Sequence, residues 1–251
     1  MSELSSGKVA NKIAIVTGAS RGIGKAIALM LGREGARVVA TARTTEAIAD
    51  VIEQLRQIGG EGLAVSADLS VEADIQRIAD ETLARFGRID ILVNNAAIIH
   101  GQINLVDFDA HLWRQVMDVN VTGAALLTKA VLPTMIEQRA GKIINISSIG
   151  GRKGGKGRSA YRVTKAALIS LTESVAAEVK QYGIDVNCIC PGGVDTEGFR
   201  EAFGNRGRAD NPRLMLPDEI AELALFLASD ASSAITGAAI DAFGGTNPLF
   251  G

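Results

Sequence analysis

The stretch that decides the fold is TGASRGIG, from Thr17 to Gly24, which directly follows the apolar run KIAIV. An apolar run that ends in a glycine-rich turn and opens a helical pattern is typical of the first βα unit of a nucleotide-binding domain. Gly18 permits the tight turn, while Gly22 and Gly24 let the backbone approach a pyrophosphate. The N–H groups at the start of the helix would face the phosphates. The stretch therefore predicts a dinucleotide site.

The same alternation of strand and helix patterns continues along the chain. Apolar strands are expected within 12–18, 36–41, 62–70, 89–97, 141–148, 183–193 and 237–245, and helices at 23–33, 46–58, 71–86, 109–139, 160–182 and 217–229. The long 109–139 region should be interrupted near Gly123 and Pro133. Near-continuous apolar strands joined by such helices predict a parallel sheet covered on both faces. With no linker in sight, residues 1–251 should form one doubly wound, Rossmann-type α/β domain of about seven strands.

Composition narrows the classes of protein. The chain has 251 residues, is 47% hydrophobic and 22% charged, and has a net charge of -2. It can bury a large core, and its surface as a whole is not built for nucleic acid. Cys188 and Cys190 have no further ligands at useful spacing, so we expect reduced structural thiols and no metal. No signal peptide and no long apolar run are evident. A cytoplasmic protein without a membrane or nucleic-acid partner is expected.

The basic stretch SSIGGRKGGKGRSAYRVTK, from Ser147 to Lys165, contains the expected reaction chemistry. Tyr161 and Lys165 are four residues apart, so they project from one face of a helix. A ketone reduced by hydride must receive a proton at its oxygen. A nearby ammonium would stabilise the phenolate and lower the tyrosine pKa, as would the positive nicotinamide of an oxidised cofactor. Ser148, at the end of the fifth strand, could hydrogen-bond the same oxygen. The stretch therefore predicts a reaction centre at the carboxyl edge of the sheet.

The combined motifs resemble the short-chain dehydrogenase/reductase family over essentially the whole chain. Besides GxxxGxG and YxxxK, the matching segments are SADLS, NNAA, MDVNVTG and CPGGVDTEG, in the family's order. Within NNAA, Ala97 stands where the family has glycine. The closest subgroup resemblance is to the 3-oxoacyl-carrier-protein reductases, which are NADP(H)-dependent ketoreductases.

This resemblance implies a set of functional residues. The catalytic residues would be Asn120, Ser148, Tyr161 and Lys165, with Asn120 holding a water in a proton relay. The cofactor-binding residues would be Gly18, Ser20, Arg21, Gly22, Ile23, Gly24, Arg43, Asp68, Leu69, Asn95, Ala96, Tyr161, Lys165, Pro191, Gly192, Val194 and Thr196. Among these, Asp68 would bind the adenine amino group, Thr196 the nicotinamide carboxamide and Lys165 the nicotinamide ribose. Residues at about 197–216 resemble a substrate lid, and the helices around 110–138 and 160–181 would pair across subunits in a homotetramer or homodimer.

The end of the second strand bears on the choice of cofactor. It reads ATARTT, so Ala42 stands where NAD-preferring relatives have an acid that binds the ribose hydroxyls, and Arg43 follows it. Arg21 lies in the glycine loop. Two guanidiniums and no carboxylate favour a 2′-phosphate, so we expect NADP(H) rather than NAD(H). The alternative is two solvated arginines.

The resulting expectation is an NADP(H)-dependent oxidoreductase that interconverts a ketone and a secondary alcohol, with Tyr161 as general acid and base. Its substrate would be a small ketone or a 3-oxoacyl thioester. The alternatives are an NAD-dependent alcohol, sugar or steroid dehydrogenase, and an NADP(H) sensor without turnover. Two local questions also stay open: Phe199 and Phe203 could line the pocket or pack, and the cations at 152–158 could be a solvated rim or attract an anionic substrate. His100 and His111 are expected to be solvated or capping, and Trp113 to pack.

Overall fold

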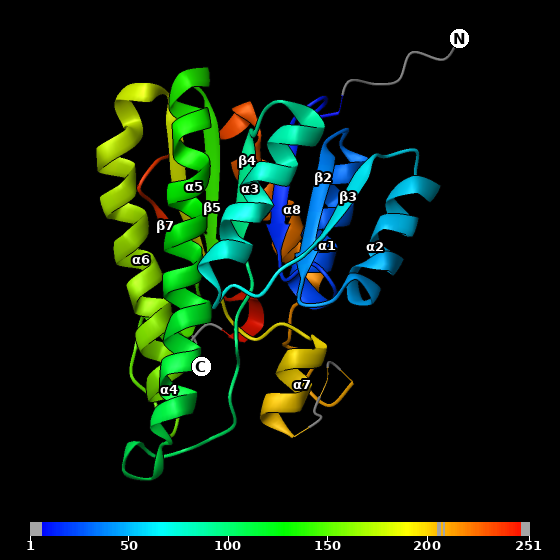
Figure 1. Cartoon of the computed structure of the whole chain (residues 1–251). Helices are drawn as coiled ribbons and strands as arrows, with labels where there is room; N and C mark the ends of the chain where they lie inside the picture. The colour runs from blue at the N-terminus through cyan, green and yellow to red at the C-terminus, as the bar shows by residue number, and fades with distance from the viewer. Residues whose placement is uncertain (1–6, 205–206, 208, 247–251) are drawn as a thin grey trace.

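The computed structural model describes residues 7–204, 207 and 209–246, and its centre is a seven-stranded parallel sheet in the order β3-β2-β1-β4-β5-β6-β7 (Figure 1). The strands are β1 (Ile13–Thr17), β2 (Arg37–Ala42), β3 (Gly62–Ser66), β4 (Ile91–Asn94), β5 (Gly141–Ile146), β6 (Ile184–Pro191) and β7 (Ala239–Ala242). The chain builds outward from β1 to β3 and then returns to place β4 on the other side of β1. Ligands of such sheets bind at this reversal point, beyond the carboxyl ends of the strands.

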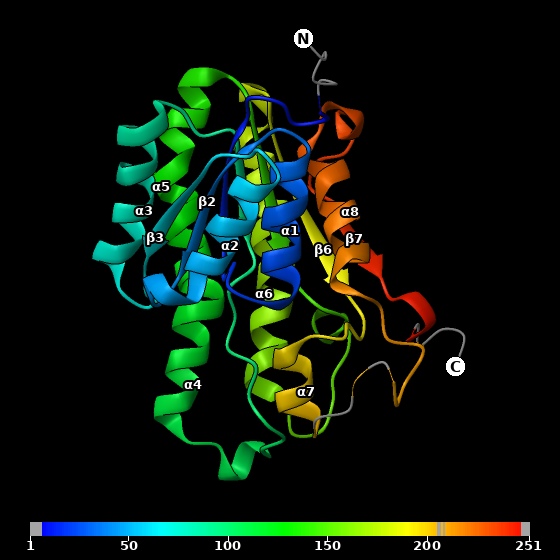
Figure 2. The same ribbon diagram turned by 90° about the vertical axis from the view of Figure 1, so that its right-hand side faces the viewer.

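Helices cover both faces of the sheet. Figure 2 shows the sheet between the two layers of helices. They are α1 (Gly22–Arg33), α2 (Thr45–Gln57), α3 (Glu72–Phe86), α4 (Ala110–Met117), α5 (Gly123–Gln138), α6 (Ser159–Val179), α7 (Glu197–Phe203) and α8 (Pro217–Ala228). One core cluster joins the sheet to α1, α2 and α8, and a second joins it to α3, α5 and α6. The doubly wound Rossmann-type architecture expected from the sequence is confirmed.

The long helical region after β4 differs from the expectation at one of its two breaks. Near Gly123 the helix does change form, because a π-helical turn at Asp118–Thr122 separates α4 from α5. Pro133, in contrast, lies inside an unbroken α5. Pro133 is exposed, whereas Val131 and Met135 on either side are fully buried. Packing against the core therefore holds the helix through the proline, which overrides the local signal.

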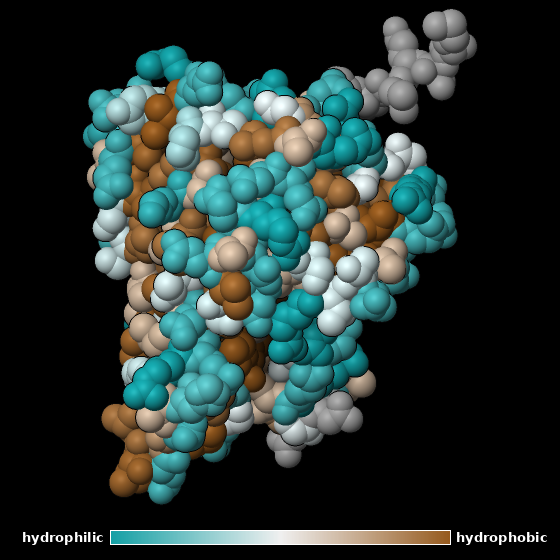
Figure 3. All heavy atoms as spheres, in the orientation of Figure 1, coloured by the Kyte–Doolittle hydropathy of each residue, from teal (hydrophilic) through white to brown (hydrophobic). Residues whose placement is uncertain are grey.

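By length and composition alone, the helical stretch Ala110–Gln138 is apolar enough to cross a membrane. A core helix passes the same test, and Leu127, Val131 and Met135 of α5 pack in the second core cluster. In this structure, α5 is therefore one of the helices that cover the sheet. Figure 3, in the orientation of Figure 1, shows hydrophobic and hydrophilic residues side by side on this side of the molecule.

Candidate active site

The glycine turn after β1 has a backbone conformation and close contacts that leave no room for larger side chains. Gly18 and Gly22 have φ angles of 62° and 55°, in the left-handed region that favours glycine. A Cβ on Gly24 would lie 2.3 Å from the Gly18 carbonyl oxygen and 2.4 Å from Asn95 Nδ2. Arg21, at the N-cap of α1, makes no side-chain hydrogen bond to the first turn of the helix. The turn thus has the form required of a pyrophosphate cradle.

The NNAA segment ties this turn to the end of β4. Thr17 Oγ1 accepts hydrogen bonds from the backbone N–H groups of Asn95 (2.9 Å) and Ala96 (3.1 Å), and Asn95 Nδ2 donates to the Thr17 carbonyl (2.8 Å). Among the described residues only Asn11 and Arg139 combine a side chain with a positive φ. Ala97 therefore replaces the family's glycine at a position where alanine is unstrained.

At the carboxyl ends of β2 and β3 lie the residues expected to hold the adenosine end of a cofactor. Asp68 Oδ1 accepts from the backbone N–H (2.8 Å) and hydroxyl (2.7 Å) of Ser70, which fixes its carboxylate, and Leu69 beside it is buried. Arg43 is exposed, and no described carboxylate forms an ion pair with it. Arg21, however, is bound to Glu201 of α7 at 2.5 and 3.0 Å, and this contact raises its pKa. The two arginines therefore stand in different surroundings.

The two serines after β5 face different ways. Ser147 is buried, and its hydroxyl donates to the Lys165 carbonyl of α6 at 2.7 Å. Ser148 Oγ accepts from the Gly150 N–H at 3.0 Å and forms a hydrogen bond with the Tyr161 side chain. The structure thus places the Ser148 hydroxyl beside Tyr161, while Ser147 anchors α6 to the end of β5.

Lys165 lies below Tyr161 on the same helix and is only 2% exposed. Its Nζ donates to the Ile146 carbonyl at 2.7 Å and lies 5.6 Å from the centre of the Tyr161 ring. Burial lowers the pKa of Lys165 from 10.5 to about 8. The Lys165 cation is therefore partly neutralised at alkaline pH.

The expected lowering of the Tyr161 pKa is wrong for the chain by itself. Burial raises this pKa, and the opposing effects of the Ser148 hydrogen bond and of the Arg158 and Arg162 charges are smaller. Desolvation disfavours the phenolate more than these groups stabilise it. Tyr161 therefore carries its proton at neutral pH and is ready to donate it.

Asn120 owes its position to the π-helical turn, which directs it inward. It is 1% exposed; its Oδ1 accepts from the Ile98 N–H (2.7 Å), and its Nδ2 donates to the Ile98 carbonyl (3.1 Å) and Thr164 Oγ1 (3.2 Å). Thr164 in turn donates to the Tyr161 carbonyl at 2.7 Å. Asn120 thus connects the segment after β4 to α6, close to Tyr161.

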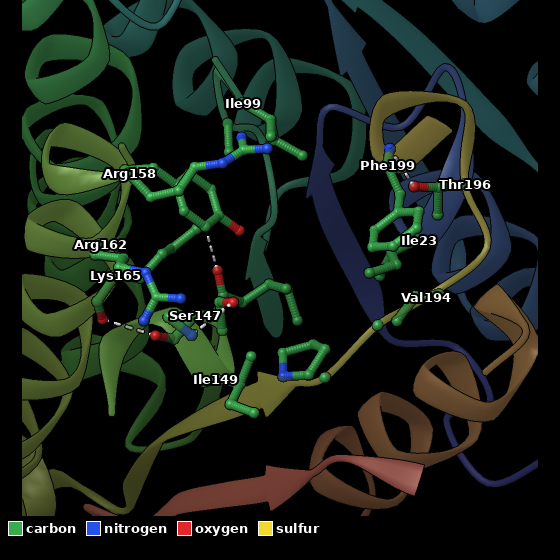
Figure 4. Close-up of a pocket in the computed structure, with 18 of the residues that line it drawn as sticks. Ile23, Ile99, Ser147, Ile149, Arg158, Arg162, Lys165, Val194, Thr196 and Phe199 are labelled. Atoms are coloured by element: carbon green, nitrogen blue, oxygen red, sulfur yellow. Dashed lines mark hydrogen bonds between the residues drawn. The ribbon is translucent and has the colours of Figure 1, made fainter. Parts of the chain in front are cut away.

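A cavity of about 230 Å³ lies between the start of α1, the start of α6 and the segment after β6 (Figure 4). Of the residues named from the sequence, it is lined by Ile23, Asn95, Ser148, Tyr161, Lys165, Pro191, Gly192, Val194 and Thr196. Gly18, Ser20, Arg21, Gly22, Gly24, Arg43, Asp68, Leu69, Ala96 and Asn120 are not among its lining residues. Thr196 caps α7 by accepting from the Phe199 N–H at 3.1 Å, so its hydroxyl also has a structural role.

The lid expected at 197–216 begins with α7 and returns to the sheet before α8. The Met215 N–H donates to the Gly193 carbonyl at 2.9 Å, and the Asp195 N–H donates to the Met215 carbonyl at 2.8 Å. Residues 205, 206 and 208 lie outside the described residues. Phe199 and Phe203 stack with ring centres 4.6 Å apart, and both line the cavity, which answers that open question.

The cations of the 152–158 loop divide into three kinds. Arg152 binds Asp241 at 2.8 Å and the Ala239 carbonyl at 2.6 Å, so it holds the loop to β7. Lys153 and Lys156 are exposed. Arg158 is 8% exposed; it donates to the carbonyls of His100 and, at 2.9 Å, of Ala202. The pattern of charges in the sequence did not separate these roles, because all four cations share one glycine-rich loop.

His100 has the capping role that was one of its two expected roles. Its Nε2 accepts from the Tyr161 N–H at 3.2 Å, while Nδ1 lies 2.6 Å from the Gly101 carbonyl, so the proton is assigned to Nδ1. Burial lowers the His100 pKa, which favours this neutral form. Trp113 packs edge-on against Phe108, at 5.7 Å between ring centres, and His111 is exposed. The described residues contain no cluster of potential metal ligands.

Comparison with known proteins agrees with this geometry. Residues 12–206 match the short chain dehydrogenase family. The 3-oxoacyl-[acyl-carrier-protein] reductase FabG of Vibrio cholerae is 41% identical over 242 residues, which cover 93% of this chain and 96% of that protein. A short-chain type dehydrogenase/reductase from Mycobacterium marinum has a similar structure, with a TM-score of 0.90, 32% identity and coverage of 98% and 100%. So does a single-residue variant of the actinorhodin polyketide ketoreductase with NADPH, with a TM-score of 0.88, 32% identity and coverage of 95% and 98%.

Proposed function

This chain belongs to the short-chain dehydrogenase/reductase family of oxidoreductases, and from that premise we propose that it is an NADP(H)-dependent ketoreductase. The observation that carries the proposal is the contact of Ser148 with Tyr161 in the cavity that Lys165 and Ile23 of α1 also line. This arrangement puts a proton donor in the same cavity as Ile23, near the end of the glycine turn. A protein that only sensed the cofactor would not need such a donor.

In the proposed reaction, the nicotinamide cofactor supplies the hydride that adds to the carbonyl carbon. Ser148 and Tyr161 hold the carbonyl oxygen by hydrogen bonds and fix its direction. Tyr161 then gives its proton to that oxygen as negative charge develops there. Arg158, Arg162 and the nearby Lys165 stabilise the phenolate that remains. In the reverse direction the phenolate takes the proton of the alcohol.

NADP(H) is supported over NAD(H) by the end of β2. Ala42 leaves no carboxylate for the ribose hydroxyls, and Arg43 beside it is exposed and ready to pair with a 2′-phosphate. The similar actinorhodin ketoreductase was solved with NADPH. The Vibrio cholerae relative, named for reducing 3-oxoacyl-[acyl-carrier-protein], makes a 3-oxoacyl thioester one substrate to test beside small ketones.

We also propose that the protein is a cytoplasmic homotetramer. Its two cysteines are free and buried, which suits a reducing compartment. Helices α5 and α6 lie side by side on the outside of the domain (Figure 1). The exposed residues of α6 include a row of small side chains at helical spacing, Ala166, Ser170, Ser174 and Ala177. Such a row lets another helix approach closely, which supports pairing of this face with a second copy.

The test of the proposed reaction uses the two tyrosines of the chain. NADPH oxidation is measured with a panel of simple ketones and 3-oxoacyl thioesters. Tyr161→Phe should lower kcat by about a hundredfold or more, because it removes the proton donor. Tyr182→Phe, a tyrosine outside the cavity, should leave the rate unchanged. NADPH binding should survive in both variants; full turnover by Tyr161→Phe would show the assigned mechanism to be wrong.

A further inference from the structure

The charged residues that line the cavity are all cations. They are Arg158, Arg162 and Lys165, and none of the described lining residues is Asp or Glu. Lys165 already has a role in the proposed reaction. The charges of the two arginines also favour the phenolate, but a distant charge could do that, so the position of each guanidinium in a mostly apolar lining remains to be explained.

Arg158 is placed as a ligand-binding group would be. It lies three residues before Tyr161, almost one turn of helix away, and is 8% exposed. Its guanidinium lies 4.1 Å over the Phe203 ring and donates to the His100 and Ala202 carbonyls. Figure 4 shows it beside Ile99, across the cavity from Phe199 and Thr196.

The described surroundings of Arg158 supply no counter-ion for its charge. Among the described residues no carboxylate forms an ion pair with it. A guanidinium has five N–H donors, of which the two carbonyls take two. Burying an unpaired cation costs free energy, and an anionic ligand would offset that cost. Arg162, by comparison, uses its guanidinium on the Lys153 and Gly154 carbonyls of the loop.

We propose that Arg158 binds a carboxylate of the substrate, so that the enzyme reduces ketones carrying a carboxylate a few bonds from the carbonyl. The inference rests on the proposed ketoreductase function and names its substrate class. The planar fork of the guanidinium matches a carboxylate in a bidentate pair, and the phenyl ring of Phe203 holds the fork in place.

An anionic carrier is the other source of negative charge, and it would act elsewhere. The phosphate of a carrier protein is joined to the acyl group through a long, neutral pantetheine arm. It would therefore lie outside the cavity, near exposed cations such as Lys153 and Lys156, and not against buried Arg158.

The experiment compares each keto acid with its own methyl ester. The substrates are 2-oxo acids of four to eight carbons, 4-oxo acids of five to eight carbons, the methyl ester of each, and a 3-oxoacyl thioester, all with NADPH. The quantity measured is the ratio of kcat/KM for acid and ester, which cancels any inactive fraction of a variant. The wild type should prefer acids by at least about tenfold. Arg158→Gln should lower this ratio about tenfold or more, mainly through KM, and Arg158→Lys should keep part of it.

Lys156→Gln is the matched control, because it removes one exposed charge from the same loop. It should leave the ratio unchanged; an equal loss in this variant would mean general steering and would overturn the inference. An unchanged ratio in Arg158→Gln would also overturn it, leaving Arg158 as a clamp between α7 and His100. If Arg158→Gln does not fold, a wild-type preference for esters is sufficient to reject the carboxylate site. Reduction of esters or thioesters but not acids would reject this inference alone, whereas no reduction of any carbonyl would contradict the proposed function itself.

Discussion

Lys165 holds its charge where water hardly reaches it, being 2% exposed with a pKa of about 8 in place of 10.5. Between those two pH values the unfolded chain binds more protons than the folded one at this position. Stability should therefore rise with pH through this window, and the cost of the buried cation should be fully present below about pH 8. The shift corresponds to at most about 3 kcal/mol of unfolding free energy.

Lys165→Met isolates this effect. The unfolding free energy, measured with denaturant at pH 7, 8, 9 and 10, should rise less across the range in the variant than in the wild type. The absolute stability of the variant at one pH is less informative, because Met also leaves the Ile146 carbonyl without its donor. Parallel pH profiles for the two proteins would show that Lys165 does not titrate in this window.

Arg43 is the residue on which cofactor choice should depend most. It is exposed beside Ala42, and a 2′-phosphate would gain a charge-assisted pair there. Arg43→Asp should lower kcat/KM for NADPH by about tenfold or more relative to NADH. The control is Arg33→Asp, which changes an exposed arginine at the last residue of α1, away from the glycine turn. It should not change the ratio. If Arg43→Asp left the preference as it was, the assignment of NADP(H) from this position would be refuted.

At the scale of elements, an ion pair joins the glycine turn before α1 to α7, where a substrate lid is expected. Arg21 and Glu201 are both more than half exposed and bind through two contacts of 2.5 and 3.0 Å. Because a cofactor phosphate would compete with Glu201 for Arg21, Glu201→Gln should tighten NADP⁺ binding by roughly two- to fivefold, the range of an exposed ion pair. Calorimetry can check this, with Glu222→Gln of α8 as the control. Weaker binding by Glu201→Gln would show that the pair orients Arg21 for the cofactor.

The sequence predicts best those elements whose structure follows from the residues within the element itself. The runs around Ile15, Leu92 and Ile189 are apolar on both sides, which only a covered strand satisfies. Gly123 indicates a break in the long helical region, but not that the break is the π-helical turn that contains Asn120, because the form of the turn depends on how α4 and α5 pack. The break expected at Pro133 is absent for the same reason. The destabilising effect of a proline on a helix is local, whereas the core packing that holds α5 together involves distant residues. Arg158 shows this most clearly, since its burial comes from Phe203 and the Ala202 carbonyl of α7.

For the whole molecule, motif order along the chain was enough to place Ser148, Tyr161 and Lys165 at one edge of the sheet, because parallel strands bring their carboxyl ends together. The electrostatics of that site could not be read in the same way. Spacing placed Lys165 beside Tyr161, but the direction of the tyrosine pKa depends on burial, and burial is a property of the folded chain. Residue types and order thus predict which groups meet, whereas the folded structure decides their protonation.

Assembly is the prediction that belongs to the whole molecule. If α6 pairs with its counterpart in another copy, a large charged side chain in its row of small residues should separate the two helices. Light scattering should give about four times the 26.2 kDa chain mass for the wild type, and a smaller assembly for Ser174→Arg. Ala49→Arg, an exposed site on α2, should leave the mass unchanged because α2 covers the opposite face of the sheet. A monomeric wild type, or a Ser174→Arg variant that stays tetrameric, would contradict pairing through α6.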